Sequence, residues 1–179
     1  MKFCSTKLRG AYLIQLQPAR DKRGFFARTF CVDEFKTHGL VTDYPQHSFS
    51  FSAHRGTLRG MHFQREPSGE TKLVRCVQGA IFDVIIDIRP DSPTYRSWQH
   101  FELSSENDHQ LYIPKGFAHG FQTLTDDVAV NYLISAPYEP ELASGIRFDD
   151  SSFGISWPLA VTEISEKDLH WPDYKQSEL

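Results

Sequence analysis

The stretch GTLRGMHFQREPSGETKLVRCVQG, residues 56–79, contains two runs with the alternating pattern of β-strands, separated by a Pro-Ser-Gly turn. We expect the two runs to form a hairpin. Alternation places Arg59 and Met61 on one face of the first run and His62 in the other register. A glycine inside a strand pattern indicates a bulge or a close backbone approach, so we expect Gly60 to redirect the side chains beside it.

Basic side chains gather on this predicted hairpin. Arg59, Lys72 and Arg75 accompany His62 on runs that are otherwise largely apolar. Such a group predicts an anion-binding site that contains a base. The alternative is structural, because a lone histidine in a strand is usually a hydrogen-bonded framework residue, and strand arginines and lysines usually point to solvent. The stretch alone leaves both interpretations open.

Short strand-like runs separated by glycine and proline turns recur along the whole chain, which is typical of an all-β sandwich or barrel. Long helical periodicity is missing, and neither GxGxxG nor a P-loop motif occurs, which argues against a Rossmann domain. We expect short helices at 33–38 and around ISEKD (164–168). The remaining predicted strands are 11–17, 25–30, 46–52, 80–89, 98–103, two runs within 109–124, 128–134 and a weak one at 145–148.

The run AIFDVIIDIR (80–89) is the strongest predicted strand. Asp83 and Asp87 fall on the same face as Ile81 and Ile85. Carboxylates on an apolar strand need partners, because an unpaired buried charge is costly. They either face an aqueous cleft or form structural pairs, and the second interpretation is favoured for Asp87.

Size and composition restrict the class of protein. The 179 residues predict a single domain, 1–179. A net charge of −4 argues against general nucleic-acid binding. Three cysteines without CxxC spacing fit reduced thiols in a cytoplasmic protein. We find no signal-peptide core and no membrane-spanning apolar run.

The residue types allow three chemistries to be compared: a metal site, covalent catalysis and proton transfer. The chain has 8 histidines but neither HxH nor HxxxH, and His119 has no acidic neighbour in sequence, so we expect no metal. The sequence has no GxSxG motif and no cysteine in an activating context, so it does not indicate covalent catalysis. Proton transfer remains, with His62 as base, Tyr132 as acid, Lys72 as electrostatic partner and a late carboxylate as orienter. Taken alone, Tyr132 also fits an ordinary core tyrosine.

Nine motifs in order closely resemble the dTDP-4-dehydrorhamnose 3,5-epimerases, from the second predicted strand to residue 168. The resemblance implies a cupin-type jelly roll with short peripheral helices that forms a homodimer and uses no metal or cofactor. LRGMHFQ, YIPKGFAHGF and ISEKD carry it most specifically. The motifs are RGFF (23–26), LRGMHFQ (58–64), KLVRCVQGAIFDVIIDIR (72–89), SPTY (92–95), YIPKGFAHGF (112–121), NYLISAPYEPE (131–141), FDD (148–150), ISWP (155–158) and ISEKD (164–168).

For the mechanism, the resemblance implies acid–base chemistry beside the C4 ketone of a nucleotide-linked 4-keto-6-deoxyhexose. His62 matches the base and Asp168 its orienting carboxylate. Tyr132 matches the proton donor on the opposite face of the sugar, and Lys72 the residue that stabilises the enolate oxygen. The pathway implied is deoxysugar synthesis for a surface polysaccharide, such as a lipopolysaccharide O-antigen, or for a secondary metabolite.

The resemblance also implies a nucleotide site, with arginines on the diphosphate and aromatic rings stacked on the base. In the family, the 23–28 strand reaches across the dimer, so some contacts are expected from the partner subunit. The residues that match the family's contacts, or fill its contact positions, are Arg23, Phe26, Arg28, Gln46, Ser48, Arg59, His119, Tyr138 and Lys167.

Three positions depart from the family pattern. The family usually has glutamate where this chain has Arg28 and Ala143, and asparagine where it has Ser48. We therefore expect the proton chemistry to be kept, while the nucleotide base and the carbon inverted stay open. The alternatives are single-site epimerisation of a CDP- or GDP-linked ketosugar, ketoisomerisation on the same fold, and a non-catalytic sugar-nucleotide binding module.

Overall fold

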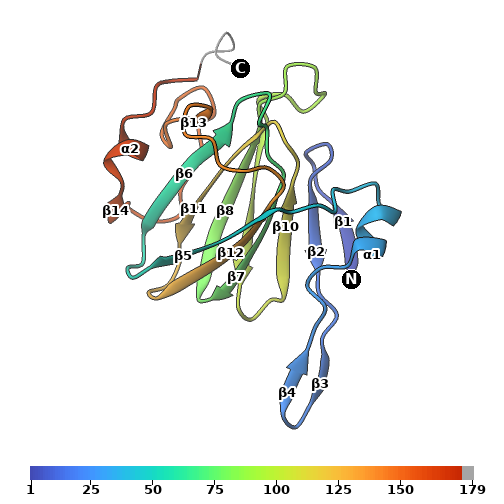
Figure 1. Cartoon of the computed structure of the whole chain (residues 1–179). Helices are drawn as coiled ribbons and strands as arrows, with labels where there is room; N and C mark the ends of the chain where they lie inside the picture. Colours follow the sequence, from blue (N-terminus) through green and yellow to red (C-terminus); the bar gives the residue numbers. More distant parts are fainter. Residues whose placement is uncertain (175–179) are drawn as a thin grey trace.

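The computed structural model describes residues 1–174, and within this range most of the chain forms two packed β-sheets. Figure 1 shows the two sheets as the layers of a sandwich. Neighbouring strands are antiparallel, except that β14 (Glu163–Ile164) runs parallel to β6. The first sheet has the order β1 (Lys2–Ser5), β2 (Tyr12–Gln15), β10 (His109–Ile113), β7 (Lys72–Gln78), β12 (Val128–Ile134), β5 (Gln46–Ser52). The second has the order β13 (Ala143–Gly145), β6 (Thr57–Gln64), β11 (Phe117–Thr123), β8 (Ala80–Asp87), β9 (Trp98–Ser104).

The main core lies between the sheets and follows the predicted alternation. On β8, Ile81 and Ile85 are fully buried against Val74 and Val130 of the first sheet. The alternate side chains of β8, such as Val84, join a second core on the outer face of the second sheet. The jelly-roll class expected from the sequence is therefore confirmed, because alternation decides which face of each strand is buried.

The predicted hairpin of residues 56–79 is wrong. β6 and β7 form as expected, but they belong to different sheets, and residues 65–71 connect the two. β6 pairs with β11 and β13, whereas β7 pairs with β10 and β12. Alternation predicts a strand locally but does not identify its neighbour, and the short connection suggested a hairpin that does not form.

Gly60 redirects β6, as the sequence indicated. Its φ is +131°, and a Cβ at this position would overlap the backbone of Gly120 on β11. The register between β6 and β11 shifts at this point. As a result Arg59 lines a pocket while Met61 is fully buried in the outer core, so the expected shared face of these two residues is wrong.

The peripheral elements are short. Helix α1 (Val32–Thr37) covers the edge near β1, and α2 (Glu166–Leu169) lies beside β6, both close to the predicted helices. Strands β3 (Ala19–Asp21) and β4 (Gly24–Phe26) pair as an arm that projects from the sandwich (Figure 1). The predicted strand 25–30 thus ends at Phe26, and β13 begins before the predicted 145–148. No helix within residues 1–174 is long and apolar enough to span a membrane.

Candidate active site

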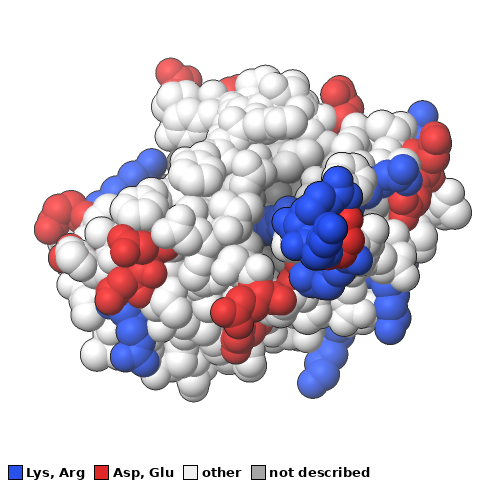
Figure 2. Space-filling view, turned by 90° about the horizontal axis from the view of Figure 1, so that it is seen from below, with Lys and Arg blue, Asp and Glu red and all other residues white. Residues whose placement is uncertain are grey.

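A pocket of about 700 Å³ opens between the two sheets. Strands β5, β7 and β12 supply one wall, and β6, β11, β13, β14 and α2 supply the other. Seen from below, the molecule has a hollow near its middle, and the Lys and Arg side chains gathered beside it lie over the β3–β4 arm, which points toward the viewer (Figure 2). Most of the predicted site residues meet in this pocket, although they come from distant parts of the chain.

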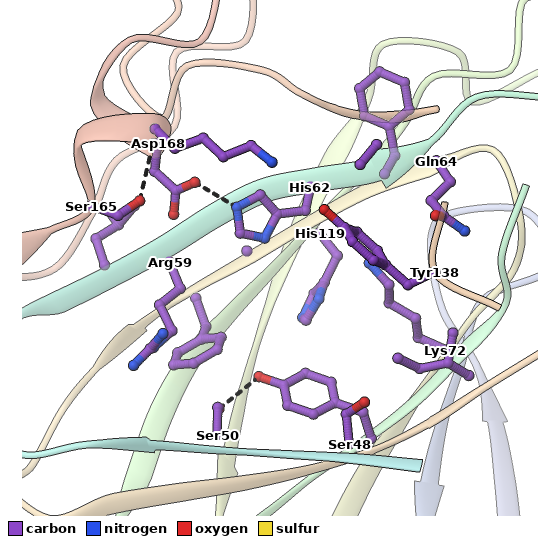
Figure 3. Close-up of a pocket in the computed structure, with 18 of the residues that line it drawn as sticks. Ser48, Ser50, Arg59, His62, Gln64, Lys72, His119, Tyr138, Ser165 and Asp168 are labelled. Carbon is purple, nitrogen blue, oxygen red and sulfur yellow. Dashed lines mark hydrogen bonds and ion pairs between the residues drawn. The ribbon is translucent and has the colours of Figure 1, made fainter. Parts of the chain in front are cut away.

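His62 and Asp168 form a hydrogen-bonded pair on one wall (Figure 3). The Nε2 atom of His62 lies 2.6 Å from Oδ1 of Asp168, whose other oxygen accepts the Gly60 N–H at 3.1 Å. The Ser165 hydroxyl accepts the Asp168 amide and caps α2. Burial alone would raise the pKa of the Asp168 carboxyl, but hydrogen bonds from His62 and Gly60 and the nearby imidazole hold this pKa below its usual value.

This pairing leaves Nδ1 of His62 as the ring nitrogen available to a ligand. Figure 3 shows the second nitrogen of the His62 ring directed into the pocket. The side chain of His62 is 44% exposed, whereas that of Asp168 is 6% exposed. A carboxylate that accepts Nε2–H fixes the tautomer and makes the imidazole a better proton acceptor.

Tyr132 lies on the other wall. It projects from β12 into the pocket, and its hydroxyl lies 3.0 Å from the Ser50 hydroxyl on β5. Figure 3 places Ser50 across the pocket from His62. Burial raises the pKa of the Tyr132 phenol well above its usual range, so the hydroxyl keeps its proton at neutral pH. A protonated phenol opposite the imidazole is a suitable proton donor.

Lys72 is paired inside the same pocket with a carboxylate that the sequence analysis missed. Its Nζ lies 2.8 Å from Oε1 of Glu70, and each side chain is 11% exposed. Glu70 lies in the connection before β7, outside the strand pattern from which Lys72 was identified. The ion pair keeps a positive charge inside the pocket at limited desolvation cost.

His119 has an acidic partner, which its sequence neighbours did not reveal. Its Nε2 lies 2.7 Å from Oδ1 of Asp83, one strand away on β8, and both side chains are buried. The ring lies 6.4 Å from that of Tyr132, at the floor of the pocket. Within the described residues, no group of three or more His, Cys, Asp or Glu side chains could hold a metal ion.

Five more of the predicted binding residues line the pocket, and three do not. Arg59 is oriented by the Ser52 hydroxyl, which accepts from its Nε at 3.0 Å, and by the Phe51 carbonyl at 2.8 Å. The three that lie elsewhere are exposed residues of the arm and the segment after it, Arg23, Phe26 and Arg28. The five that line the pocket are Gln46, Ser48, Arg59, Tyr138 and Lys167.

Two of the departures from the family pattern also lie in the pocket. Ser48 is opposite Tyr132 in the β5–β12 register, and Ala143 is opposite Gln64 in the β13–β6 register. Arg28 lies outside the pocket, where its guanidinium is 3.3 Å from Glu34. The departures therefore alter the shape and polarity of the lining but leave the His62–Asp168 pair and Tyr132 in place.

A two-sheet sandwich with a histidine–aspartate pair and a partly buried tyrosine facing one pocket defines a cupin-type jelly-roll enzyme. The family model described as dTDP-4-dehydrorhamnose 3,5-epimerase matches residues 5–176. The chain therefore belongs to the dTDP-4-dehydrorhamnose 3,5-epimerase family and is an isomerase.

Individual relatives agree with this assignment. The dTDP-4-dehydrorhamnose 3,5-epimerase of Methanothermobacter thermautotrophicus is 45% identical over 98% of this chain and 96% of its own. A crystal structure of the Legionella pneumophila epimerase in complex with dTDP-4-keto-L-rhamnose has a TM-score of 0.89 at 34% identity, covering 97% of this chain and 98% of that one. A 3′-monoepimerase from Streptomyces bikiniensis in complex with dTDP-quinovose has a TM-score of 0.88 at 31% identity, covering 95% and 86%.

Proposed function

We propose that this protein epimerises a nucleotide-linked 4-keto-6-deoxyhexose, with a dTDP sugar as the leading substrate, at carbon 3, carbon 5 or both. The observation that carries the proposal is the placement of His62 with Asp168 on one wall of a pocket and of Tyr132 on the other. Inversion requires a base and an acid on opposite faces of the sugar ring. The ligands named for the Legionella and Streptomyces relatives support the substrate class.

In the proposed mechanism, Nδ1 of His62 removes the proton from a carbon beside the C4 ketone. The electron pair moves to the ketone oxygen and gives an enolate, while Asp168 stabilises the imidazolium that forms. Tyr132 then delivers its proton to the opposite face of the same carbon, which inverts the centre. The half-exposed His62 ring and the raised pKa of Tyr132 both support these roles.

Lys72 is proposed to stabilise the enolate oxygen. An ammonium group in a partly desolvated pocket interacts more strongly with a developing oxyanion than it would in water. Glu70 keeps the ammonium in place in the absence of substrate. Arg59 and Lys167, at the edge of the same pocket, are proposed to bind the diphosphate, and the half-exposed ring of Tyr138 to stack on the base.

The test is exchange of solvent deuterium into the sugar. A dTDP-4-keto-6-deoxyglucose incubated with the enzyme in deuterated water should gain deuterium at carbon 3, carbon 5 or both, and NMR identifies which. A carbonyl that moves between carbons 3 and 4 would instead show a ketoisomerase. Nucleotide binding without exchange would show a binding module and would end the proposal.

The nucleotide base is tested separately by thermal unfolding with dTDP, CDP, GDP and UDP. A ligand that binds the folded state stabilises it in proportion to the logarithm of its concentration over Kd. We expect dTDP to give the largest rise in melting temperature. A larger rise with CDP or GDP would move the assignment to that nucleotide, while the proton chemistry would remain as proposed.

We also propose a homodimer in which the β3–β4 arm completes the partner's pocket. The arm projects from the sandwich and carries Arg23 and Phe26, the latter 79% exposed (Figure 1). Mixing Arg23→Ala and His62→Ala chains tests this arrangement. If Arg23 acts across the dimer, random reassociation restores about a quarter of the sites, because one site in each mixed dimer is intact. No recovery after verified chain exchange would contradict the shared site.

The activity itself is proposed to belong to a cytoplasmic pathway that makes deoxysugars for a surface polysaccharide or a secondary metabolite.

A further inference from the structure

The carboxylate of Asp168 accepts a third donor that the proposed mechanism does not use. Nε1 of Trp171 lies 3.2 Å from Oδ1 of Asp168, the same oxygen that accepts from His62. The indole ring is edge-on to the His62 ring, with the centroids 6.5 Å apart. Trp171 therefore touches both members of the pair on this wall of the pocket.

Two further contacts fix the indole in this position. Gly145 on β13 lies directly beneath it, and a Cβ at residue 145 would overlap the indole ring. The Lys167 ammonium lies 5.1 Å from the centre of the ring, a cation–π distance. The indole N–H is thus directed at Asp168 by packing as well as by the short distance along the chain.

We propose that Trp171 is a positioning residue that limits the basicity of the His62–Asp168 pair and holds both side chains, together with Lys167, in their working orientation. The inference rests on the proposed role of His62. An N–H bonded to Oδ1 withdraws negative charge from the oxygen that faces the imidazole. Without this bond the carboxylate would stabilise the imidazolium more strongly, and His62 would stay protonated to a higher pH.

Other charged groups face this wall and must be kept constant in the test. They come from β6, β11, β14 and α2, the elements that contribute titratable side chains to this part of the pocket, whereas β13 contributes none. These groups are Arg59, His119, Glu163 and Lys167.

The main variant is Trp171→Phe, which keeps an aromatic ring but removes the N–H. We expect the acid limb of the pH–rate profile for deuterium exchange to move to higher pH by about half a unit. The plateau rate should fall about three- to tenfold, because the pair is less well oriented. Trp157→Phe is the matched control, because the Trp157 N–H bonds the Phe148 carbonyl away from the pocket and its loss should leave the acid limb unchanged.

Gly145→Ala displaces the indole without removing it. It should move the acid limb in the same direction as Trp171→Phe, and it should have no further effect in a Trp171→Ala background. An acid limb that is unchanged in folded Trp171→Phe or Gly145→Ala protein would overturn the inference.

A measurement on the unaltered protein needs neither substrate nor a variant. The chain has 3 tryptophans, and the indole N–H resonance of Trp171 should move with the NMR titration of the His62 imidazole, while those of Trp98 and Trp157 should not. If no indole resonance follows that titration, Trp171 does not act on the pair. Because this readout is independent of turnover, its failure is distinguishable from failure of the proposed epimerase activity.

Discussion

Within residues 1–174, two histidine–aspartate pairs lie in neighbouring positions, and they differ in access to the pocket. His62 and His119 are opposite each other in the β6–β11 register. The His62 side chain is 44% exposed and its partner Asp168 is 6% exposed, whereas the His119–Asp83 pair is 5% and 0% exposed. The two bond lengths, 2.6 and 2.7 Å, are almost equal. The chemical pair is the same, so accessibility is what makes His62 the candidate base and places His119 in the floor.

The carboxylates also differ. Asp168 accepts bonds on both oxygens, from His62 and Trp171 on one and from the Gly60 amide on the other. Oδ2 of Asp83 has no protein partner within the described residues. Asp168, with both oxygens bonded, holds the His62 imidazole in one orientation. The unsatisfied oxygen of Asp83 lies in a buried region, where the negative charge of this carboxylate adds to burial in favouring the protonated form of Tyr132.

The largest effect is expected from removing the accessible imidazole. His62→Ala should lower deuterium exchange at the sugar carbons by about a thousandfold or more, because the variant loses the imidazole nitrogen that is directed into the pocket. His119→Ala, its matched control, should cost about ten- to a hundredfold through poorer substrate binding. Both rates are measured by NMR in deuterated water, with circular dichroism confirming the fold. Activity of His62→Ala within tenfold of the unaltered enzyme would refute the role of the base.

The orienting carboxylates should rank in the same order. Asp168→Asn should lower kcat by about a hundredfold, because the amide no longer stabilises the imidazolium and no longer selects the tautomer. Asp83→Asn should lower kcat by only about tenfold. Steady-state kinetics on the two purified variants decides the point, and an equal or reversed ranking would remove the distinction between the pairs.

Folding stability should show the opposite ranking. Asp83→Asn changes a buried hydrogen-bonded pair and should reduce the free energy of unfolding by about 1–3 kcal/mol. Asp168→Asn should cost less, because His62 is accessible to water. Urea unfolding monitored by tryptophan fluorescence gives both values. A larger loss for Asp168→Asn would show that the pocket wall, not the floor, carries the structural role.

The smallest expected effect is on the loss of folding stability at acidic pH. The pKa of Asp168 is lowered in the folded protein, so its stabilising contribution is present above the ordinary carboxyl pKa, near 3.8, and is lost as the pH falls through the folded value. Between pH 6 and pH 3, Asp168→Asn should therefore lose less stability than the unaltered protein, by about 1 kcal/mol or less. Parallel curves from urea titrations at each pH would contradict this.

Local patterns predicted most strands, but not how the strands pair. Alternation placed Asp83 on the same face of its strand as Ile81 and Ile85, as the structure has it. It did not show that β6 and β7 part into different sheets, because pairing is decided by packing of the whole sandwich.

Local sequence patterns did not predict the contacts between residues that are distant along the chain. Asp83 is separated from His119 by 36 residues, and only the β8–β11 register brings them together. Two nearer contacts had a signal. Glu70 is two residues from Lys72, and Trp171 is three residues from Asp168, so the short separation along the chain keeps each pair close.

The central claim is that one ring on each wall acts on opposite faces of the sugar, and the ratio of inversion to exchange in Tyr132→Phe tests it most directly. If His62 abstracts the proton and Tyr132 delivers the new one, the variant should continue to wash deuterium into the sugar while the inverted product falls far more. If inversion and exchange decline in equal proportion, or if inversion persists at the normal rate, the two-wall account is contradicted.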